Sequence, residues 1–244
     1  MIRVGIGGWN YEPWRETFYP KGTPQAKELE YASRQVTAIE INATFYRTQS
    51  VASFKKWATS TPDDFMFSVK APRAAVQPKD LREAKESIEW FFNSGVSELG
   101  SKLGPIFWQM APYKKFDAAE MSAYFDMLPD KVKKVPLRHA LEVRHASFTD
   151  GVFLKLARER NIAVVTVESE KHPLITEPTA DFAYARLELT QADEPTGYAK
   201  PALKKWAKTA RDWEKKGDVL LYFISGAKER NPAAAKAMLD ILKA

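Results

Sequence analysis

The sequence predicts an α/β fold, a single (β/α)8 barrel of the TIM type that spans residues 1–244. The first reason is that eight short apolar runs alternate with segments of helical periodicity, and their starts are about 20 to 40 residues apart, as in strand–helix units. The second reason is the length of 244 residues, which suits one such barrel. The third is that no Gly/Ser-rich or Pro-rich linker divides the chain.

Each predicted strand is an apolar run bounded by turn or helix signals. The eight runs cover residues 3–9, 37–46, 64–72, 104–112, 138–148, 161–169, 182–190 and 218–226. In several of them apolar residues share one phase: Ile39 and Ile41 alternate with Glu40. In a barrel we expect the apolar phase to face the surrounding helices and the other phase to face the axis. In the sixth run this rule places Val165 and Val167 under the helices and Glu168 on the axis.

Seven segments between and after these runs have helical periodicity. They cover residues 24–34, 50–60, 78–94, 118–127, 151–160, 200–216 and 231–243. Several begin with a capping residue or with a proline in the first turn, namely Thr23-Pro24, Asp117, Asp150 and Asn231-Pro232. After the sixth strand, Pro173 and Pro178 interrupt the chain, so we expect the helix there to be short or missing.

The composition excludes several classes of function. The chain has no cysteine and three histidines, which excludes disulfides, thiolate nucleophiles and cysteine-based metal sites. No apolar run approaches the roughly 20 residues of a membrane span, and residues 1–7 do not resemble a signal peptide. We therefore expect a cytoplasmic protein with no membrane partner. The sequence carries no signal for an oligomeric state.

The net charge of +6 raises the question of a nucleic-acid partner. Most of it comes from residues 200–216, where seven basic and two acidic side chains give a net charge of +5. Leu203, Trp206, Ala207 and Ala210 recur at helical spacing in this segment. That pattern favours the solvated face of an amphipathic helix. The alternative is a patch that follows the phosphates of a nucleic acid.

Six ordered motifs resemble the domain of unknown function 72 family, also called YecE-like. They are residues 7–14 (GGWNYEPW) with 18–20 (FYP), 40–46 (EINATFY), 65–70 (FMFSVK), 109–112 (QMAP), 142–145 (EVRH) and 184–186 (YAR). The resemblance covers nearly the whole chain and implies a TIM-type barrel, with no activity assigned. The chain departs from the family at residues 222–226 (YFISG), where the family is rich in asparagine, although Asn231 follows.

Polar residues gather toward the carboxyl ends of the predicted strands, the end that carries the active site in barrel enzymes. The candidate anions are Glu40, Glu142 and Glu168, and the candidate cations are Lys70, Arg144 and Arg186. We expect Glu40 or Glu142 to be a general base and the two arginines to hold an anionic or carbonyl oxygen. For Lys70 an electrostatic clamp is favoured over a Schiff-base nucleophile. The structural alternative is an ion-pair network that fills the barrel.

Further residues are candidates for contacts with a substrate. They are Trp9, Tyr11, Asn42, Tyr46, Gln109 and Tyr184, together with the two arginines. The aromatic residues near the ends of the first two strands could form a stacking surface for a sugar or a base, or a hydrophobic lid on the barrel.

We expect no metal and no other cofactor. The three histidines, His139, His145 and His172, are too scattered for a histidine cluster. His139 shares its phase with Leu141 and is expected under a helix, so His145 at a strand end is the histidine of interest. The alternative is a divalent metal held by Glu40, Glu142 and Glu168.

The sequence thus favours an enzyme that acts by acid–base chemistry on a small anionic or phosphorylated substrate, which can contain a sugar. Its reaction class is left open. The first alternative is a protein that binds nucleic acid or processes phosphodiesters. The second is a barrel that binds a metabolite without turnover.

Overall fold

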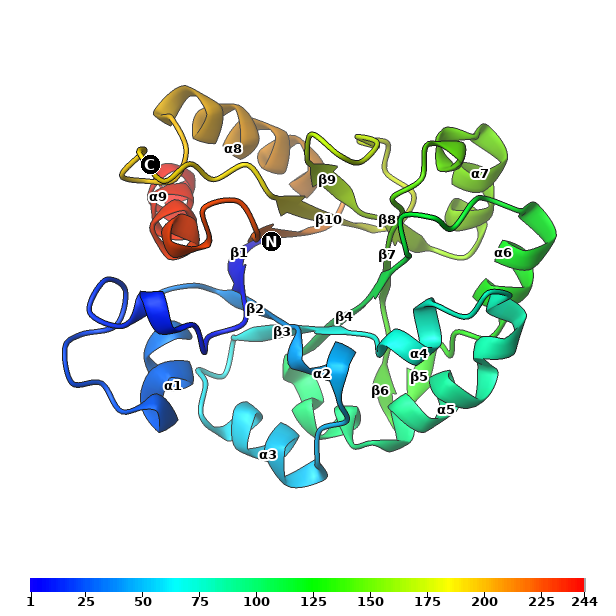
Figure 1. Cartoon of the computed structure of the whole chain (residues 1–244), viewed down its shortest axis with the longest axis horizontal. Coiled ribbons are helices and arrows are strands. Elements are labelled where there is room, and N and C mark those ends of the chain that lie inside the picture. Colours follow the sequence, from blue (N-terminus) through cyan, green and yellow to red (C-terminus); the bar gives the residue numbers. More distant parts are fainter. Residues whose placement is uncertain (244) are drawn as a thin grey trace.

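The computed structural model describes residues 1–243, and its strands curve into a barrel with helices on the outside (Figure 1). The strands of the main sheet are all parallel. In sheet order they are β8 (Ile162–Val164), β7 (His139–Glu142), β4 (Leu103–Gln109), β3 (Met66–Lys70), β2 (Ala38–Ile41), β1 (Ile2–Gly7), β11 (Asp218–Phe223), β10 (Phe182–Leu187) and β9 (Thr166–Glu168). The two outermost strands, β8 and β9, are successive pieces of the sixth predicted strand. The predicted eightfold barrel is therefore confirmed, with a break in that strand at Val165.

The predicted helices form, but two begin later than expected: α1 and α5 start four and seven residues after the predicted starts at residues 24 and 78, each preceded by a 3-10 helix. The α-helices that follow strands or their loops are α1 (Glu28–Ala32), α3 (Val51–Thr59), α5 (Lys85–Asn93), α6 (Ala118–Asp126), α7 (Gly151–Glu159), α8 (Lys200–Glu214) and α9 (Asn231–Lys243). Short 3-10 helices lie at η1 (Glu12–Trp14), η2 (Gln25–Lys27), η3 (Leu81–Ala84), η4 (Val96–Lys102), η5 (Ala146–Thr149) and η6 (Lys228–Arg230). As predicted, no helix forms between β9 and β10.

The predicted caps are confirmed at two helices. Asp117 accepts a hydrogen bond from the Glu120 backbone, and Asp150 accepts one from Val152. The cap predicted at Thr23 is wrong, because its hydroxyl donates to the carbonyl of Pro20 instead. The sequence also gave no indication of a small antiparallel pair between β5 (Lys131–Val132) and β6 (Val135–Pro136).

Several predicted strands end earlier than expected, most clearly the second. It stops at Ile41, and the chain turns into the short helix α2 (Ala43–Tyr46). A hydrogen bond stabilises this turn, because the hydroxyl of Thr44 donates to the carbonyl of Lys70 at 2.6 Å. A similar short helix, α4 (Arg73–Val76), follows β3. These early turns bring polar side chains over the barrel mouth.

The predicted phases hold in most strands but are wrong in the sixth. Val165 and Val167 belong to the apolar cluster inside the barrel, whereas Val164 packs in the outer core under the helices. The rule failed here because Ile162 and Val164 make the opposite phase apolar as well. Glu168 consequently points outward and is not at the mouth.

Gly5 shows how the barrel interior is filled. A Cβ at this position would lie 2.3 Å from the carbonyl oxygen of Ala38 and 2.7 Å from the ring of Tyr222. The glycine therefore leaves room for the tyrosine ring inside the barrel. Above it, the rings of Tyr184 and Phe107 stack with centroids 5.6 Å apart. These aromatic rings form an apolar floor on which the polar groups of the mouth rest.

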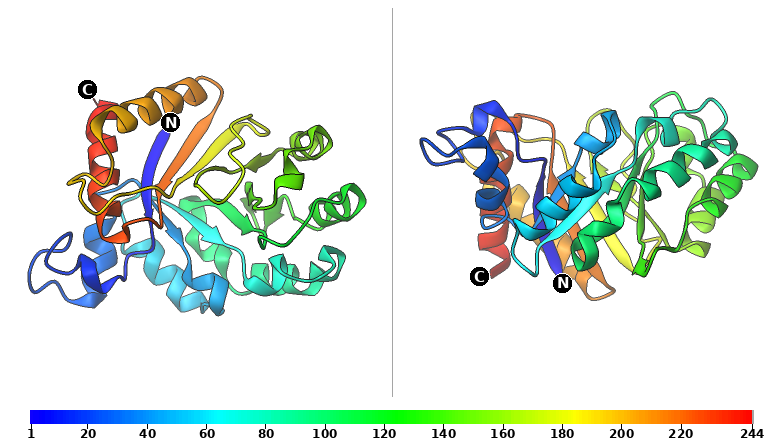
Figure 2. Two further views of the ribbon diagram at one scale, coloured as in Figure 1. Left: turned by 45° about the horizontal axis from the view of Figure 1, so that its top comes forward. Right: turned by 90° about the horizontal axis from the view of Figure 1, so that it is seen from below.

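The right-hand view of Figure 2 shows the start of β1 and the end of α9 at the same end of the barrel. The carboxyl ends of the strands lie at the other end, because all strands of the main sheet run parallel. Within residues 1–243, no helix is both long enough and apolar enough to cross a membrane.

Candidate functional site

A pocket of about 570 Å³ opens at the carboxyl ends of the strands. β1, β3 and β4 end on it at Gly7, Lys70 and Gln109, and the segments after β2, β7 and β11 add the rest of its wall. Seven of the predicted site residues line it: Trp9, Asn42, Tyr46, Lys70, Gln109, Arg144 and Arg186. The mouth predicted from the strand phases is thus a real cavity.

Four predicted site residues do not line this pocket. Glu40, Glu142 and Tyr184 are almost completely buried. Tyr11 stands beside the pocket, where its ring packs against Trp14 and under the ammonium group of Lys228, 4.1 Å from the ring centroid. These residues support the pocket wall.

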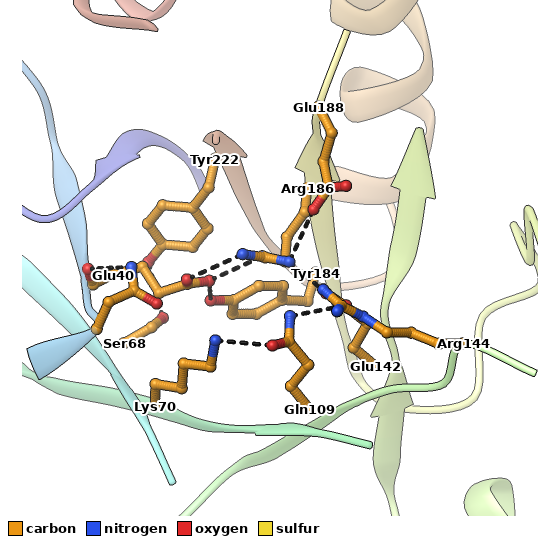
Figure 3. A network of polar contacts seen from close by, with 11 residues as sticks. Glu40, Ser68, Lys70, Gln109, Glu142, Arg144, Tyr184, Arg186, Glu188 and Tyr222 are labelled. Carbon is orange, nitrogen blue, oxygen red and sulfur yellow. Dashed lines mark hydrogen bonds and ion pairs between the residues drawn. The ribbon is translucent and has the colours of Figure 1, made fainter. Parts of the chain in front are cut away.

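Arg186 is the centre of the buried network drawn in Figure 3. Its Nη1 donates to Glu142 and, at 2.9 Å, to Glu188. Its Nη2 donates to Glu40 at 3.4 Å, and its Nε lies 3.3 Å from the same carboxylate as an ion pair without hydrogen-bond geometry. Burial alone would lower the pKa of Arg186, but these carboxylates outweigh burial and raise it. The side chain therefore stays charged and holds three carboxylates at once.

Glu142 is a fixed anion in this arrangement. It accepts hydrogen bonds from Gln109 Nε2 at 2.8 Å and from Arg144 Nε at 2.6 Å, besides the one from Arg186. Burial raises the pKa of Glu142, but the two arginines more than offset burial and lower it to about 2. A carboxylate with this pKa takes up almost no protons near pH 7, so the geometry does not favour Glu142 as the general base.

Lys70 differs from Arg144 and Arg186 because no carboxylate within residues 1–243 contacts it. Its Nζ donates to Gln109 Oε1 at 2.8 Å and lies 4.4 Å from the centroid of the Phe45 ring. The residue is 8% exposed. Burial and the nearby Arg186 lower the pKa of Lys70 to about 8. Gln109, held by Glu142 through its amide nitrogen, orients the ammonium group toward the pocket.

The pocket wall is cationic. Of the residues within 1–243 that line it, five are basic and none is acidic; the basic ones are Arg47, Lys70, Arg144, Arg186 and Lys228. Arg47 and Lys228 are absent from the predicted site. Both follow a strand closely, after α2 and in η6, and that position was the only available signal. Asn231 also lines the pocket, with its Oδ1 accepting from the Thr190 hydroxyl at 2.9 Å.

Glu188 takes the place that was predicted for Glu168. It lies two residues after Arg186, in the same strand phase, and burial raises the pKa of its carboxyl. Glu168 instead points to α8, where it accepts hydrogen bonds from Tyr198 at 2.6 Å and Trp206 at 2.7 Å. The expectation that Glu168 contributes to the mouth is therefore wrong.

The position of Glu168 leads to a prediction for Trp206→Phe. The change removes the indole donor of a partly buried carboxylate, so we expect the free energy of unfolding to fall by about 1 kcal/mol. Urea denaturation followed by circular dichroism measures the difference. The matched control is Trp213→Phe on the same helix, because its indole donates to no residue in the described part of the chain. An equal loss in both variants would show that packing alone accounts for the effect.

Two of the three histidines have structural partners, whereas the buried Nδ1 of His172 hydrogen-bonds no residue within 1–243. His139 is buried under the outer core, as predicted, between the Trp108 indole and the Pro129 carbonyl. His145 Nδ1 accepts from the Ser147 backbone and caps η5. Among residues 1–243, no group of three histidine, aspartate or glutamate side chains is placed to hold a metal ion.

Comparisons with known proteins agree with this architecture. The family model described as "Protein of unknown function DUF72" matches residues 3–244, which confirms the predicted family resemblance. The UPF0759 protein YunF of Bacillus subtilis (strain 168) is 27% identical over 184 residues, a match that covers 73% of this chain and 61% of that protein. The crystal structure of a DUF72 family protein from Thermotoga maritima superposes with a TM-score of 0.80, at 21% identity and with 100% of both chains covered.

A more distant match shows the fold alone. It is D-psicose 3-epimerase from Clostridium cellulolyticum with D-tagatose, at a TM-score of 0.56 and 13% identity, covering 99% of this chain and 98% of that chain.

Proposed function

We propose an enzymatic function for this chain, which belongs to the DUF72 family of proteins of unknown function. In this proposal the chain binds a small phosphorylated substrate at the carboxyl face of the barrel and transfers a proton on it, with Lys70 as the acid–base group. The observation that carries the proposal is the state of Lys70. It is a nearly buried amine with a pKa of about 8; among residues 1–243 it has no carboxylate partner and its wall of the pocket has no acidic residue.

We expect the anion to bind to the cations whose N–H groups are not engaged by carboxylates. Arg144 uses Nε for Glu142, and its two Nη atoms hydrogen-bond no residue within 1–243. Lys228 and Arg47 line the same pocket and form no ion pair in that range. Arg186, by contrast, is fully engaged by Glu40, Glu142 and Glu188. We therefore assign substrate binding to Arg47, Arg144 and Lys228, and assign Arg186 to holding the carboxylates.

Lys70 can act as both base and acid near neutral pH. With a pKa of about 8, roughly a tenth of the amines are neutral at pH 7, and a neutral amine can accept a proton from a carbon or hydroxyl of the substrate. The ammonium ion that forms then stabilises the negative charge left on the substrate. Gln109 keeps Nζ in place during both steps. A Schiff base between Lys70 and a substrate carbonyl is the alternative use of the same amine.

The binding part of the proposal predicts that Lys70→Met weakens the affinity for inorganic phosphate about tenfold at pH 7, because one of the cations that line the pocket is lost. In the unaltered protein the affinity should also fall as pH rises through about 8, where Lys70 loses its charge. Isothermal titration calorimetry measures both effects. Lys205→Met, an exposed lysine of α8 outside the pocket, is the control for net charge. Equal weakening in both variants would contradict a specific site.

The catalytic part is tested by exchange of substrate protons with solvent. Because the distant epimerase was crystallised with a sugar, ketose and aldose phosphates form the panel. In deuterated water, 1H NMR should show loss of one carbon-bound proton signal of a substrate with the unaltered protein and not with Lys70→Met. Phosphate binding without exchange in any member of the panel would favour a non-catalytic binding barrel. A borohydride-trapped adduct on Lys70 would assign the Schiff-base route.

A further inference from the structure

A second hollow of about 650 Å³ lies next to the pocket, between α2 and α4. These two short helices stand beside each other at the mouth, inside the ring of outer helices (Figure 1). Tyr46 and Arg47 line both cavities, so the two are neighbours. A ligand that passes over these two residues would reach from the pocket into the hollow.

The hollow gathers the exposed aromatic side chains of the molecule. Tyr46 is 81% exposed, Trp90 53% and Tyr113 67%, and among residues 1–243 no other tryptophan, tyrosine or phenylalanine is exposed. All three line this one hollow. Leaving three large rings in water at one place has a cost that scattered exposed residues do not have, and such patches mark binding sites.

The hollow, like the pocket, is positively charged. Arg47 and Arg73 line it, and no aspartate or glutamate of the described chain does. Gln77 accepts a hydrogen bond from Arg73 Nε at 2.6 Å, which holds that guanidinium in place. Aromatic faces between arginines suit a planar, electron-rich ring that carries phosphate. A neutral sugar would find no carboxylate here to accept hydrogen bonds from its hydroxyls.

One aromatic ring connects the two cavities. The ring of Phe45 lies 4.4 Å from Lys70 Nζ in the pocket, and its centroid is 5.1 Å from that of Tyr46 at an interplanar angle of 84°. The edge contact keeps a face of Tyr46 available to a ligand. Phe45 thus contacts both the amine of Lys70 in the pocket and the ring of Tyr46 in the hollow.

We propose that the substrate is a nucleotide, with its phosphate in the pocket and its base stacked on Tyr46 in the hollow. This inference rests on the proposed function, because it names the class of that phosphorylated substrate. The base supplies binding energy through stacking, which tolerates different bases because each has a π-face.

The test compares three probes by isothermal titration calorimetry: adenosine 5′-monophosphate, ribose 5-phosphate and adenosine. We expect the nucleotide to bind about tenfold more tightly than ribose 5-phosphate, because only the nucleotide carries the base. Tyr46→Ala should remove this difference, because it lowers the affinity for the nucleotide to that for ribose 5-phosphate in the same variant. Tyr46→Phe should restore it, since the ring is retained. Val152→Ala, an exposed apolar residue outside both cavities, should change nothing.

The outcomes separate this inference from the proposed function. If ribose 5-phosphate binds and the nucleotide binds no more tightly, the nucleotide is overturned while the proposed function stands. If neither phosphorylated probe binds, both fail. If a single-stranded oligonucleotide binds much more tightly than the mononucleotide, with an affinity that falls steeply with salt, the ligand is a polynucleotide and the inference is again overturned.

Discussion

Replacing Arg186 with methionine is expected to lower the free energy of unfolding by about 3–5 kcal/mol. Methionine fills a similar space but leaves Glu40, Glu142 and Glu188 without the guanidinium that holds them. Glu40 and Glu142 are fully buried, so water cannot replace the lost charge. Urea denaturation at pH 7 measures the loss.

A second variant keeps this prediction testable if Arg186→Met does not fold. Adding Glu142→Gln removes one of the unpaired charges and should recover part of the stability, which a double-mutant cycle quantifies.

The pH dependence of the stability that the ion pairs contribute has a definite sign. The pKa of Glu142 is lowered to about 2 in the folded protein, so its contribution is complete above the ordinary pKa of 4.5 and is lost as pH falls toward 2. The free energies of unfolding of the unaltered protein and of Arg186→Met should therefore converge as the pH falls through that interval. A constant difference between the two proteins would contradict the ion-pair account.

Replacing Lys70 with methionine is expected to have the opposite effect and to raise the free energy of unfolding by about 2 kcal/mol at pH 7. Burial and Arg186 lower the pKa of Lys70 from 10.5 to about 8, so keeping this amine charged in the folded protein costs on the order of 3 kcal/mol. Loss of its hydrogen bond to Gln109 offsets about 1 kcal/mol of the gain. The same variant should bind phosphate more weakly, so stability and binding change in opposite directions.

The sign of this effect can be checked by pH. Because the unfolded chain binds the Lys70 proton more tightly than the folded one, the unaltered protein gains stability as pH rises from about 8 to 10.5. Chemical denaturation across this range should show the advantage of Lys70→Met shrinking toward zero. Lys205→Met, whose side chain is exposed, should show no such trend. A stability advantage that persists at pH 10.5 would mean that packing, and not charge, explains it.

The barrel could be predicted from the sequence because strand phase and helix spacing repeat along the chain, and the strand phases placed Arg186 and Glu142 at the same mouth. The inward face of the sixth strand could not be predicted, since both of its phases are apolar and only tertiary packing decides which faces inward. The same ambiguity misplaced Glu168. Arg47 and Lys228 were missed because they lie beyond the strands, where their positions depend on turns. The depressed pKa of Lys70 also depends on burial, which no single-residue pattern reveals.

The arrangement of charges at the mouth determines the distance over which the site attracts a charged ligand in solution. Glu40 and Glu142 are fully buried, whereas the five cations of the pocket wall line the cavity. The field of these cations is partly cancelled by the carboxylates behind them, so it falls off faster with distance than the field of an isolated charge. Under the proposed function, the pocket would therefore attract an anion at short range, while long-range attraction would come from the separate basic face of α8. Under the same proposal, the pocket would select a ligand by its charge, and α8 would raise the rate at which the ligand arrives by diffusion.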